Sequence, residues 1–171
     1  MTRAFPIALV AVLVACGGSP DLDGPLVGRI PDALDALAAE VGADDPDLFE
    51  VVADTTGVTL VLAESEIDND SGDVVGTFAT PYRWEGGELT RVGEVSPAAG
   101  SVFRASAISI DPGRVFERIR DELDDPEITD LVIQGGPDGS VVIDASIVND
   151  RGGRLLVLLG ADGTILGVQA A

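Results

Sequence analysis

Apolar residues recur with the period of a helix in two stretches of the chain. The positions that share one helical face are Leu34, Leu37, Ala38 and Val41 in the first stretch, and Val115, Phe116, Ile119 and Leu123 in the second. Pro31 and Pro112 stand where such helices would begin, and Asp111 is a suitable N-cap residue. Each stretch is followed by Asp-Asp-Pro, and a residue before proline disfavours helix. The pattern predicts two helices, each ending before an Asp-Asp-Pro sequence.

Apolar runs separated by glycine-containing turns follow each predicted helix. The turns are Thr56-Gly57, Gly86-Gly87, Pro137-Asp138-Gly139 and Asp162-Gly163. Such turns between apolar runs predict antiparallel hairpins. The pattern therefore predicts one helix and about four strands in each half of the chain. Residues 155–159 are apolar at every position, which predicts a strand covered on both faces. We expect two halves packed against each other to supply that cover.

Two segments of the chain align without a gap and indicate a duplication. They are "DDPDLFEVVA" at residues 44–53 and "DDPEITDLVI" at residues 124–133. Because each segment follows a predicted helix and begins a set of strands, the predicted fold class is α+β with two tandem αββββ repeats. Each repeat is expected to be a helix packed on an antiparallel sheet. The repeats are predicted at residues 28–93 and 109–171, with residues 94–108 as the connection.

The N-terminal residues have the pattern of an export signal. A cationic start with Arg3 precedes an apolar run at residues 4–15. This run is shorter than the about 20 residues that span a bilayer as a helix. The run ends at Cys16, the single cysteine of the chain, and residues 17–24 are rich in Gly, Ser, Pro and Asp. We predict a signal peptide at residues 1–15 and a flexible tether at residues 16–27.

The sequence Leu13-Val14-Ala15-Cys16 resembles the lipobox of bacterial lipoproteins. The resemblance implies that Cys16 receives a diacylglycerol, that the signal is cut before it and that the new amino group is acylated too. Because one acyl chain holds a protein to a membrane only marginally, several chains on Cys16 would give a stable anchor. The expected location is therefore extracytoplasmic, on a bacterial membrane. The alternative is that Cys16 is an ordinary buried thiol in an apolar helix.

The charge and composition exclude several classes of function. The chain has 30 acidic and 10 basic residues, which gives a formal charge of −20, and it has no histidine and no lysine. This acidity argues against nucleic acid as a partner. Without histidine or lysine, Ser-His-Asp catalysis, His/Cys zinc sites and Schiff-base chemistry are excluded. We predict a protein that is not an enzyme; the alternative is an enzyme that uses carboxylates for catalysis. The acidic charge is explained either by solubility or life in high salt, or by a docking face for a basic partner or a divalent cation.

An acidic insertion distinguishes the first half from the second. Residues 64–73 place Asp68, Asp70 and Asp73 around Gly72. Alternating carboxylates in a loop bent at glycine suit Ca²⁺, which takes six to eight oxygen ligands, and the spacing matches a calcium loop in part. The same residues are also those of an ordinary exposed turn. Calcium is therefore the one cofactor that the sequence suggests.

A set of aromatic residues also distinguishes the first half. Phe78, Tyr82 and Trp84 have even spacing on one predicted strand and so share a face. They form either the core beneath the first helix or, at Tyr82 and Trp84, an exposed interaction patch. The second alternative is considered because aromatic residues are enriched at binding hot spots.

The doubled order of helix and strands over residues 28–171 resembles the PepSY-like domains of bacterial envelope proteins and the tandem repeats of the β-lactamase-inhibitory-protein family. The resemblance lies in element order and transfers no site residue. It implies binding or inhibition rather than catalysis. The expected function is a membrane-anchored, non-catalytic binding or accessory module whose partner is another envelope protein. The alternative is a carrier that holds a small apolar ligand or lipid between helix and sheet.

Overall fold

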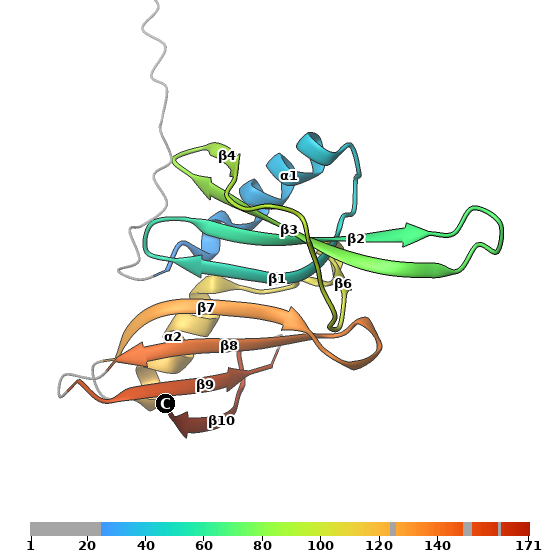
Figure 1. Cartoon of the computed structure of the whole chain (residues 1–171). Helices are drawn as coiled ribbons and strands as arrows, with labels where there is room; N and C mark the ends of the chain where they lie inside the picture. The colour runs from blue at the N-terminus through green and yellow to red at the C-terminus, as the bar shows by residue number, and fades with distance from the viewer. Residues whose placement is uncertain (1–24, 124–125, 149–151, 161) are drawn as a thin grey trace, which may run out of the picture.

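The computed structural model describes residues 25–123, 126–148, 152–160 and 162–171 of the chain (Figure 1). The predicted signal peptide and Cys16 lie outside these residues. The described chain is α+β, with a single antiparallel sheet and two α-helices, one near the N-terminal end and one in the middle of the sequence.

The first helix, α1 (Ile30–Val41), is preceded by a short 3-10 turn, η1 (Val27–Arg29). It has Pro31 in its first turn, and it ends at Gly42, whose φ of 69° is in the left-handed region that favours glycine. Its fully buried face is formed by Ile30, Ala33 and Leu37. The predicted stripe is therefore correct at Leu37, whereas Leu34 and Ala38 are only partly buried.

The packed fold begins earlier than the predicted tether allows. Pro25 is buried, Val27 is 0% exposed, and the Leu26 N–H donates to the Asp54 carbonyl at 2.8 Å. The tether boundary at residue 27 is therefore wrong, because residues 25–27 are fixed to the sheet by apolar burial and a backbone hydrogen bond.

The second helix, α2 (Pro112–Glu122), follows the predicted signals. Asp111 caps it by accepting a hydrogen bond from the Arg114 N–H at 3.2 Å, and proline occupies its first turn. Val115, Phe116 and Ile119 form its buried face. The amphipathic pattern and the cap explain why this segment is helical.

The strands pair in an order that places the beginning of each half at the centre of the sheet. They are β1 (Asp47–Asp54), β2 (Val58–Ile67), β3 (Val74–Glu85), β4 (Glu88–Arg91), β5 (Ser96–Pro97), β6 (Phe103–Arg104), β7 (Glu127–Gly135), β8 (Val141–Val148), β9 (Arg154–Leu159) and β10 (Ile165–Ala170). The order across the sheet is β10-β9-β8-β7-β1-β2-β3-β4, and β5 and β6 pair with β3 and β1. Two further 3-10 turns are η2 (Ala105–Ala107) and η3 (Pro137–Gly139).

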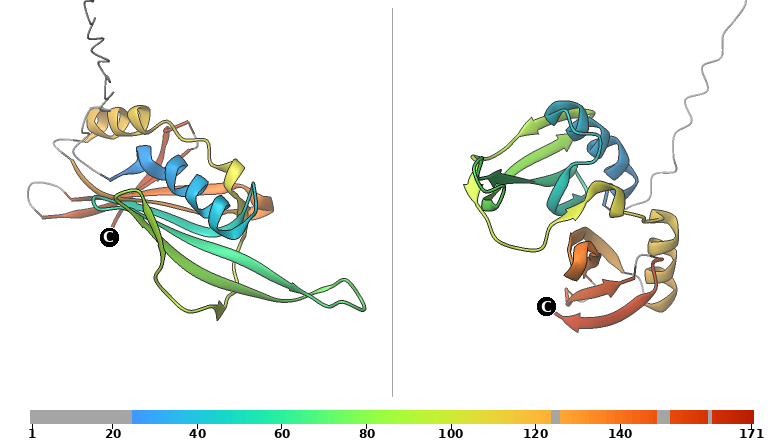
Figure 2. Two further views of the ribbon diagram at one scale, coloured as in Figure 1. Left: turned by 90° about the horizontal axis from the view of Figure 1, so that it is seen from above. Right: turned by 90° about the vertical axis from the view of Figure 1, so that its right-hand side faces the viewer.

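The two halves meet edge to edge through β1 and β7. This pairing runs from Glu50 opposite Gln134 to Asp54 opposite Asp130. Both helices lie on the same face of the sheet (Figure 2). The expectation that the halves cover each other face to face is therefore wrong, and Leu158 of β9 remains 36% exposed on the face without helices. Edge pairing satisfies the backbone groups of β1 and β7, which face-to-face packing would leave open.

One continuous core fills the space between the helices and the sheet. Its largest fully buried side chains include Phe103, Phe116, Leu37, Leu60, Leu131 and Ile143. The connection between β5 and β6 passes over the opposite face of the sheet (Figures 1 and 2). There the Ser101 carbonyl lies so close to Gly135 that an added Cβ would clash with its oxygen. Gly135 is therefore required by the close approach of this connection.

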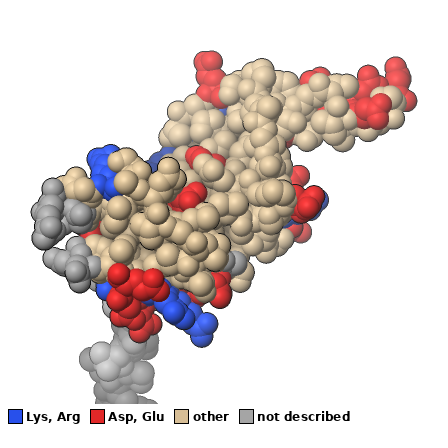
Figure 3. Space-filling model, turned by 90° about the horizontal axis from the view of Figure 1, so that it is seen from below, with Lys and Arg blue, Asp and Glu red and all other residues tan. Residues whose placement is uncertain are grey.

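The acidic insertion is the end of a long hairpin rather than a separate loop. Residues 64–67 extend β2, and Glu64, Ser65 and Glu66 pair with Phe78, Thr77 and Gly76 of β3. Only residues 68–73 form the turn. The hairpin projects beyond the sheet, and acidic side chains gather at its outer end (Figures 1 and 3).

Candidate functional site

A groove of about 510 Å³ lies between α1 and the segment that leads into α2. We call it the α1 groove. It is lined by Val27, Gly28, Ile30, Pro31, Leu34, Asp35 and Ala38 from η1 and α1, by Asp44, Asp45 and Pro46 from the following loop, and by Ala105, Ser106, Ile108, Ile110 and Pro112. The groove is open to solvent, so a bound group would remain partly exposed.

The end of the α1 groove is held by a contact between two loops. The Ser106 N–H donates to Asp45 Oδ1, and its hydroxyl donates to Asp45 Oδ2, both at 2.9 Å. The Ala105 N–H donates to the Pro46 carbonyl at 3.0 Å, and the Arg104 guanidinium lies 3.7 Å from Asp45. The Ser106 N–H is the main cause of a lowered pKa for the Asp45 carboxyl. These contacts fix the 105–107 turn against the loop that follows α1.

Apolar walls and an acidic rim define what the α1 groove can accept. Leu34, Ile108 and Ile110 are partly buried and present apolar surface. Asp35 and Asp44 are exposed at the same groove, and within the described ranges neither carboxylate has an ion pair or a side-chain hydrogen bond. Because the walls are apolar and the rim is anionic, the groove suits an apolar group carried next to a cation.

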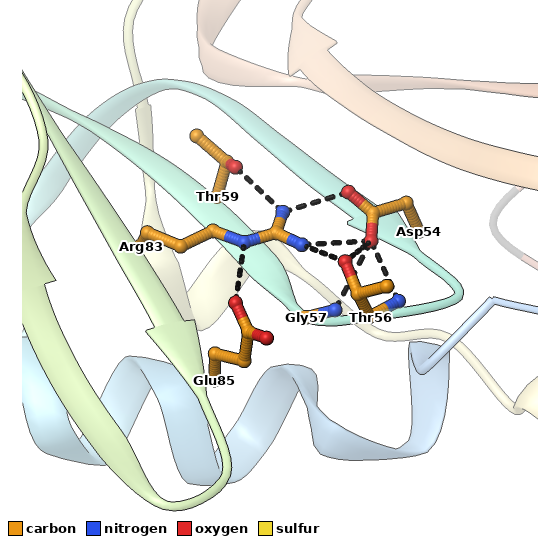
Figure 4. Close-up of polar contacts among 6 residues, drawn as sticks. All are labelled: Asp54, Thr56, Gly57, Thr59, Arg83 and Glu85. Carbon is orange, nitrogen blue, oxygen red and sulfur yellow. Dashed lines mark hydrogen bonds and ion pairs between the residues drawn. The ribbon is translucent and has the colours of Figure 1, made fainter.

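A second polar cluster joins β3 to the turn between β1 and β2 (Figure 4). Arg83 donates from Nη1 to Asp54 Oδ2 at 2.7 Å and from Nη2 to Asp54 Oδ1 at 2.8 Å. Nη2 also donates to Thr56 Oγ1 at 2.6 Å, and Nη1 donates to Thr59 Oγ1 at 3.0 Å. Arg83 holds the pKa of Asp54 well below its usual range, with further lowering from the N–H groups of Thr56 and Gly57. These groups are satisfied by one another, so the cluster is structural.

Of the three aromatic residues on β3, Trp84 and Tyr82 contribute to the core, whereas Phe78 is partly buried outside the core cluster. Trp84 is 8% exposed and belongs to the core cluster, and Tyr82 is partly buried against that cluster. The alternative that Tyr82 and Trp84 form an exposed interaction patch is therefore wrong. The physical reason is that their face of β3 is turned toward α1, which packs over this strand.

The three aspartates of the acidic turn do not converge. The Asp68 carboxylate accepts the N–H groups of Asp70 and Ser71 at 2.8 and 2.9 Å, as in an Asx turn. These N–H groups, with Ser71 first, lower the pKa of Asp68. Asp70 and Asp73 are exposed. Among the described residues, no group of three or more acidic, histidine or cysteine side chains is placed to hold a metal ion.

A smaller hollow of about 280 Å³ lies on the face without helices. It is lined by Asp144, Leu156, Leu158, Gly167, Val168 and Gln169. Burial among these residues raises the pKa of the Asp144 carboxyl. This hollow exists because no second layer from the described part of the chain covers β9 on this face.

Sequence reasoning missed the residues of the α1 groove. In the sequence, Asp44 and Asp45 belong to the segment that indicates the duplication, Ile108 to the predicted connection and Ile110 to the start of the predicted second repeat. One signal was available: Leu34 and Ala38 extend the apolar stripe of α1 beyond the face that the sheet can cover. Their partner, the 105–112 segment, is too distant in sequence to be identified from local pattern.

Comparison with family models, with curated proteins and with solved structures gave no significant match for this chain. Within the described ranges, neither helix combines the length and the apolarity that a membrane-spanning helix requires.

Proposed function

We propose that this chain is a membrane-anchored lipoprotein of the bacterial envelope that acts as a non-catalytic binding module. Its partner is another envelope protein, which presents an apolar side chain beside an arginine or lysine to the α1 groove. The observation that carries this proposal is the groove itself, with apolar walls and, at its rim, the carboxylates of Asp35 and Asp44, which have no partner among the described residues.

The charge of the chain supports a basic partner. A formal charge of −20 attracts a basic surface at long range, while the groove supplies the short-range contact. The open shape of the groove also supports a protein partner, because an exposed side chain can enter from a neighbouring surface. The lack of histidine and lysine supports a non-catalytic role.

A small amphipathic molecule is the second candidate for the same groove. The volume of about 510 Å³ is in the range of small-molecule sites, about 300–1,000 Å³. In that case the chain would be a carrier. The ligand would lie between α1 and the 105–112 segment, rather than between helix and sheet as the sequence suggested.

Site-specific photo-crosslinking in cells that make the protein separates these functions. A benzophenone amino acid replaces Leu34 or Ile108 in the groove, and replaces Val75 as a matched control because that side chain is 59% exposed on the distant hairpin. We expect one protein to be captured from both groove positions but not from Val75. Capture should fall when Asp35→Asn and Asp44→Asn are combined. Lipid capture at the groove would favour the carrier, and identical capture from all three positions would refute both.

We also propose that the fold arose from two tandem αββββ repeats. The order α1-β1-β2-β3-β4 has a counterpart in α2-β7-β8-β9-β10, and β1 and β7 occupy equivalent places at the centre of the sheet. The aligned Asp-Asp-Pro segments support the same proposal. An experimental structure in which residues 28–93 and 109–171 fail to superpose in this element order would contradict it.

A further inference from the structure

The two outer strands of the sheet differ in how they are protected. At one side, β4 is four residues long and carries Glu88 and Arg91, and charged, short strands are the usual protection of a sheet edge. At the other side, β10 is six residues long and has no charged residue. In the described chain β10 pairs only with β9, so its outer edge is open.

The open edge of β10 presents both hydrogen-bonding groups and apolar side chains. The Ala171 N–H donates to the Arg154 carbonyl at 3.1 Å, and antiparallel pairing alternates along a strand. The backbone groups of Val168 and Ala170 therefore point away from β9. Leu166 is 63% exposed and Val168 is 50% exposed along this strand. Unpaired backbone groups beside exposed apolar residues are a template for pairing with another strand.

The distribution of charge identifies the kind of partner. Figure 3 views the end of the molecule where β10 lies, and most of this surface is uncharged, while acidic side chains gather at the hairpin end and side chains of both signs gather on α2. An uncharged edge offers no attraction to a basic partner, but it lets two acidic molecules approach where their repulsion is weakest. Antiparallel pairing of a strand with its own copy is satisfied by a two-fold axis, which closes the assembly.

We propose that β10 is a dimerisation edge, at which a second copy of this chain adds its own β10 in antiparallel orientation and continues the sheet across the two-fold axis. Since a six-residue strand offers a small contact area, the dimer should depend on protein concentration. Since both copies are strongly acidic, it should also become tighter as salt screens their repulsion.

The test is sedimentation equilibrium of residues 17–171, which retain every described element because the packed fold begins at Pro25. Measurements are made over a range of protein concentrations in about 0.1 M and about 1 M NaCl, where the Debye length is about 10 Å and about 3 Å. Val168→Lys places a charge on the β10 edge, and Val75→Lys is the control, since it adds the same charge at a 59% exposed position on β3. Circular dichroism checks that both variants fold.

We expect a monomer–dimer equilibrium that tightens in high salt, is kept by Val75→Lys, and is weakened about tenfold or more by Val168→Lys, which introduces two lysines into each interface. A wild-type protein that stays monomeric in both salts would overturn the proposal. So would a dimer that survives Val168→Lys, because its interface would lie elsewhere. Open-ended larger assemblies would also overturn it, since β10 would then pair with a different surface.

Discussion

Removing the Arg83 guanidinium should destabilise the fold measurably, because Arg83 ties β3 to the turn between β1 and β2. In Arg83→Met, four hydrogen bonds are lost: two to Asp54, one to Thr56 and one to Thr59. The side chains of Arg83 and Asp54 are 19% and 34% exposed, so the pair is neither fully buried nor fully solvated.

The expected loss in the free energy of unfolding follows from this intermediate burial of Arg83 and Asp54. Exposed ion pairs contribute about 0–1 kcal/mol, and hydrogen bonds to charged groups contribute about 1.5–3 kcal/mol. Asp54 keeps the N–H groups of Thr56 and Gly57 after the substitution, which limits the penalty. We therefore expect the free energy of unfolding to fall by about 1.5 kcal/mol, or a Tm lower by about 3–6 °C.

Urea unfolding at neutral pH measures this loss, with Arg104→Met as the matched control. Arg104 is 65% exposed, lies 3.4 Å from Asp47 and 3.7 Å from Asp45, and its removal changes the net charge equally. The control should lose about 0.5 kcal/mol or less. If Arg83→Met loses no more than Arg104→Met, the assigned role of Arg83 is wrong.

The pH dependence of the free energy of unfolding gives a second check on the role of Arg83. The folded state lowers the pKa of Asp54, so the stabilisation is present above the unfolded pKa of about 3.9 and is lost as the pH falls toward the folded value. The difference in the free energy of unfolding between wild type and Arg83→Met should therefore be constant near neutral pH and should become smaller below about pH 4. A difference that grows on acidification would contradict the cause given for the lowered pKa.

Three further predictions concern the anchor, the acidic turn and the connection across the sheet. Cys16→Ser should move the protein from the detergent phase to the aqueous phase in phase separation, and unchanged partitioning would refute the anchor. Calcium and sodium chloride at equal ionic strength should give equal Tm values, because Asp68 already accepts backbone N–H groups; a calcium-specific rise that disappears on combining Asp68→Asn with Asp70→Asn would instead establish a metal site. Gly135→Ala should lower stability by about 1–3 kcal/mol in urea unfolding, because its Cβ would meet the Ser101 carbonyl, whereas Gly28→Ala, with open space around it, should cost less.

The helices and turns could be predicted because their signals are local. Asp111 and Pro112 mark the start of α2, and the turn at Gly86-Gly87 joins two strands that are neighbours in the sheet. These features depend on residues a few positions apart, where propensity and hydrogen bonding act directly.

The pairing of β1 with β7 and the α1 groove could not be predicted, because both depend on residues that are far apart in the sequence. Glu50 pairs with Gln134, and Asp45 binds Ser106 across 61 positions of sequence. An apolar run such as residues 155–159 indicates burial, but it does not say which element supplies the cover. In this fold no described element covers one face of that strand, so Leu158 stays 36% exposed.

The pairing of β1 with β7 has a consequence for how the chain folds as it is synthesised. Glu50 precedes its partner Gln134 by 84 residues. At about 5–20 residues per second, β1 therefore waits about 4–17 s for β7 to be made. The first half can form α1 and its hairpins during this delay, and β6 can pair with Asp47 and Leu48, but residues 50–54 on the inner edge of β1 stay unpaired until β7 is made. Nascent chains should be most prone to strand-mediated misassembly in that interval, and conditions that slow translation between residues 54 and 127 should lower the yield of native protein.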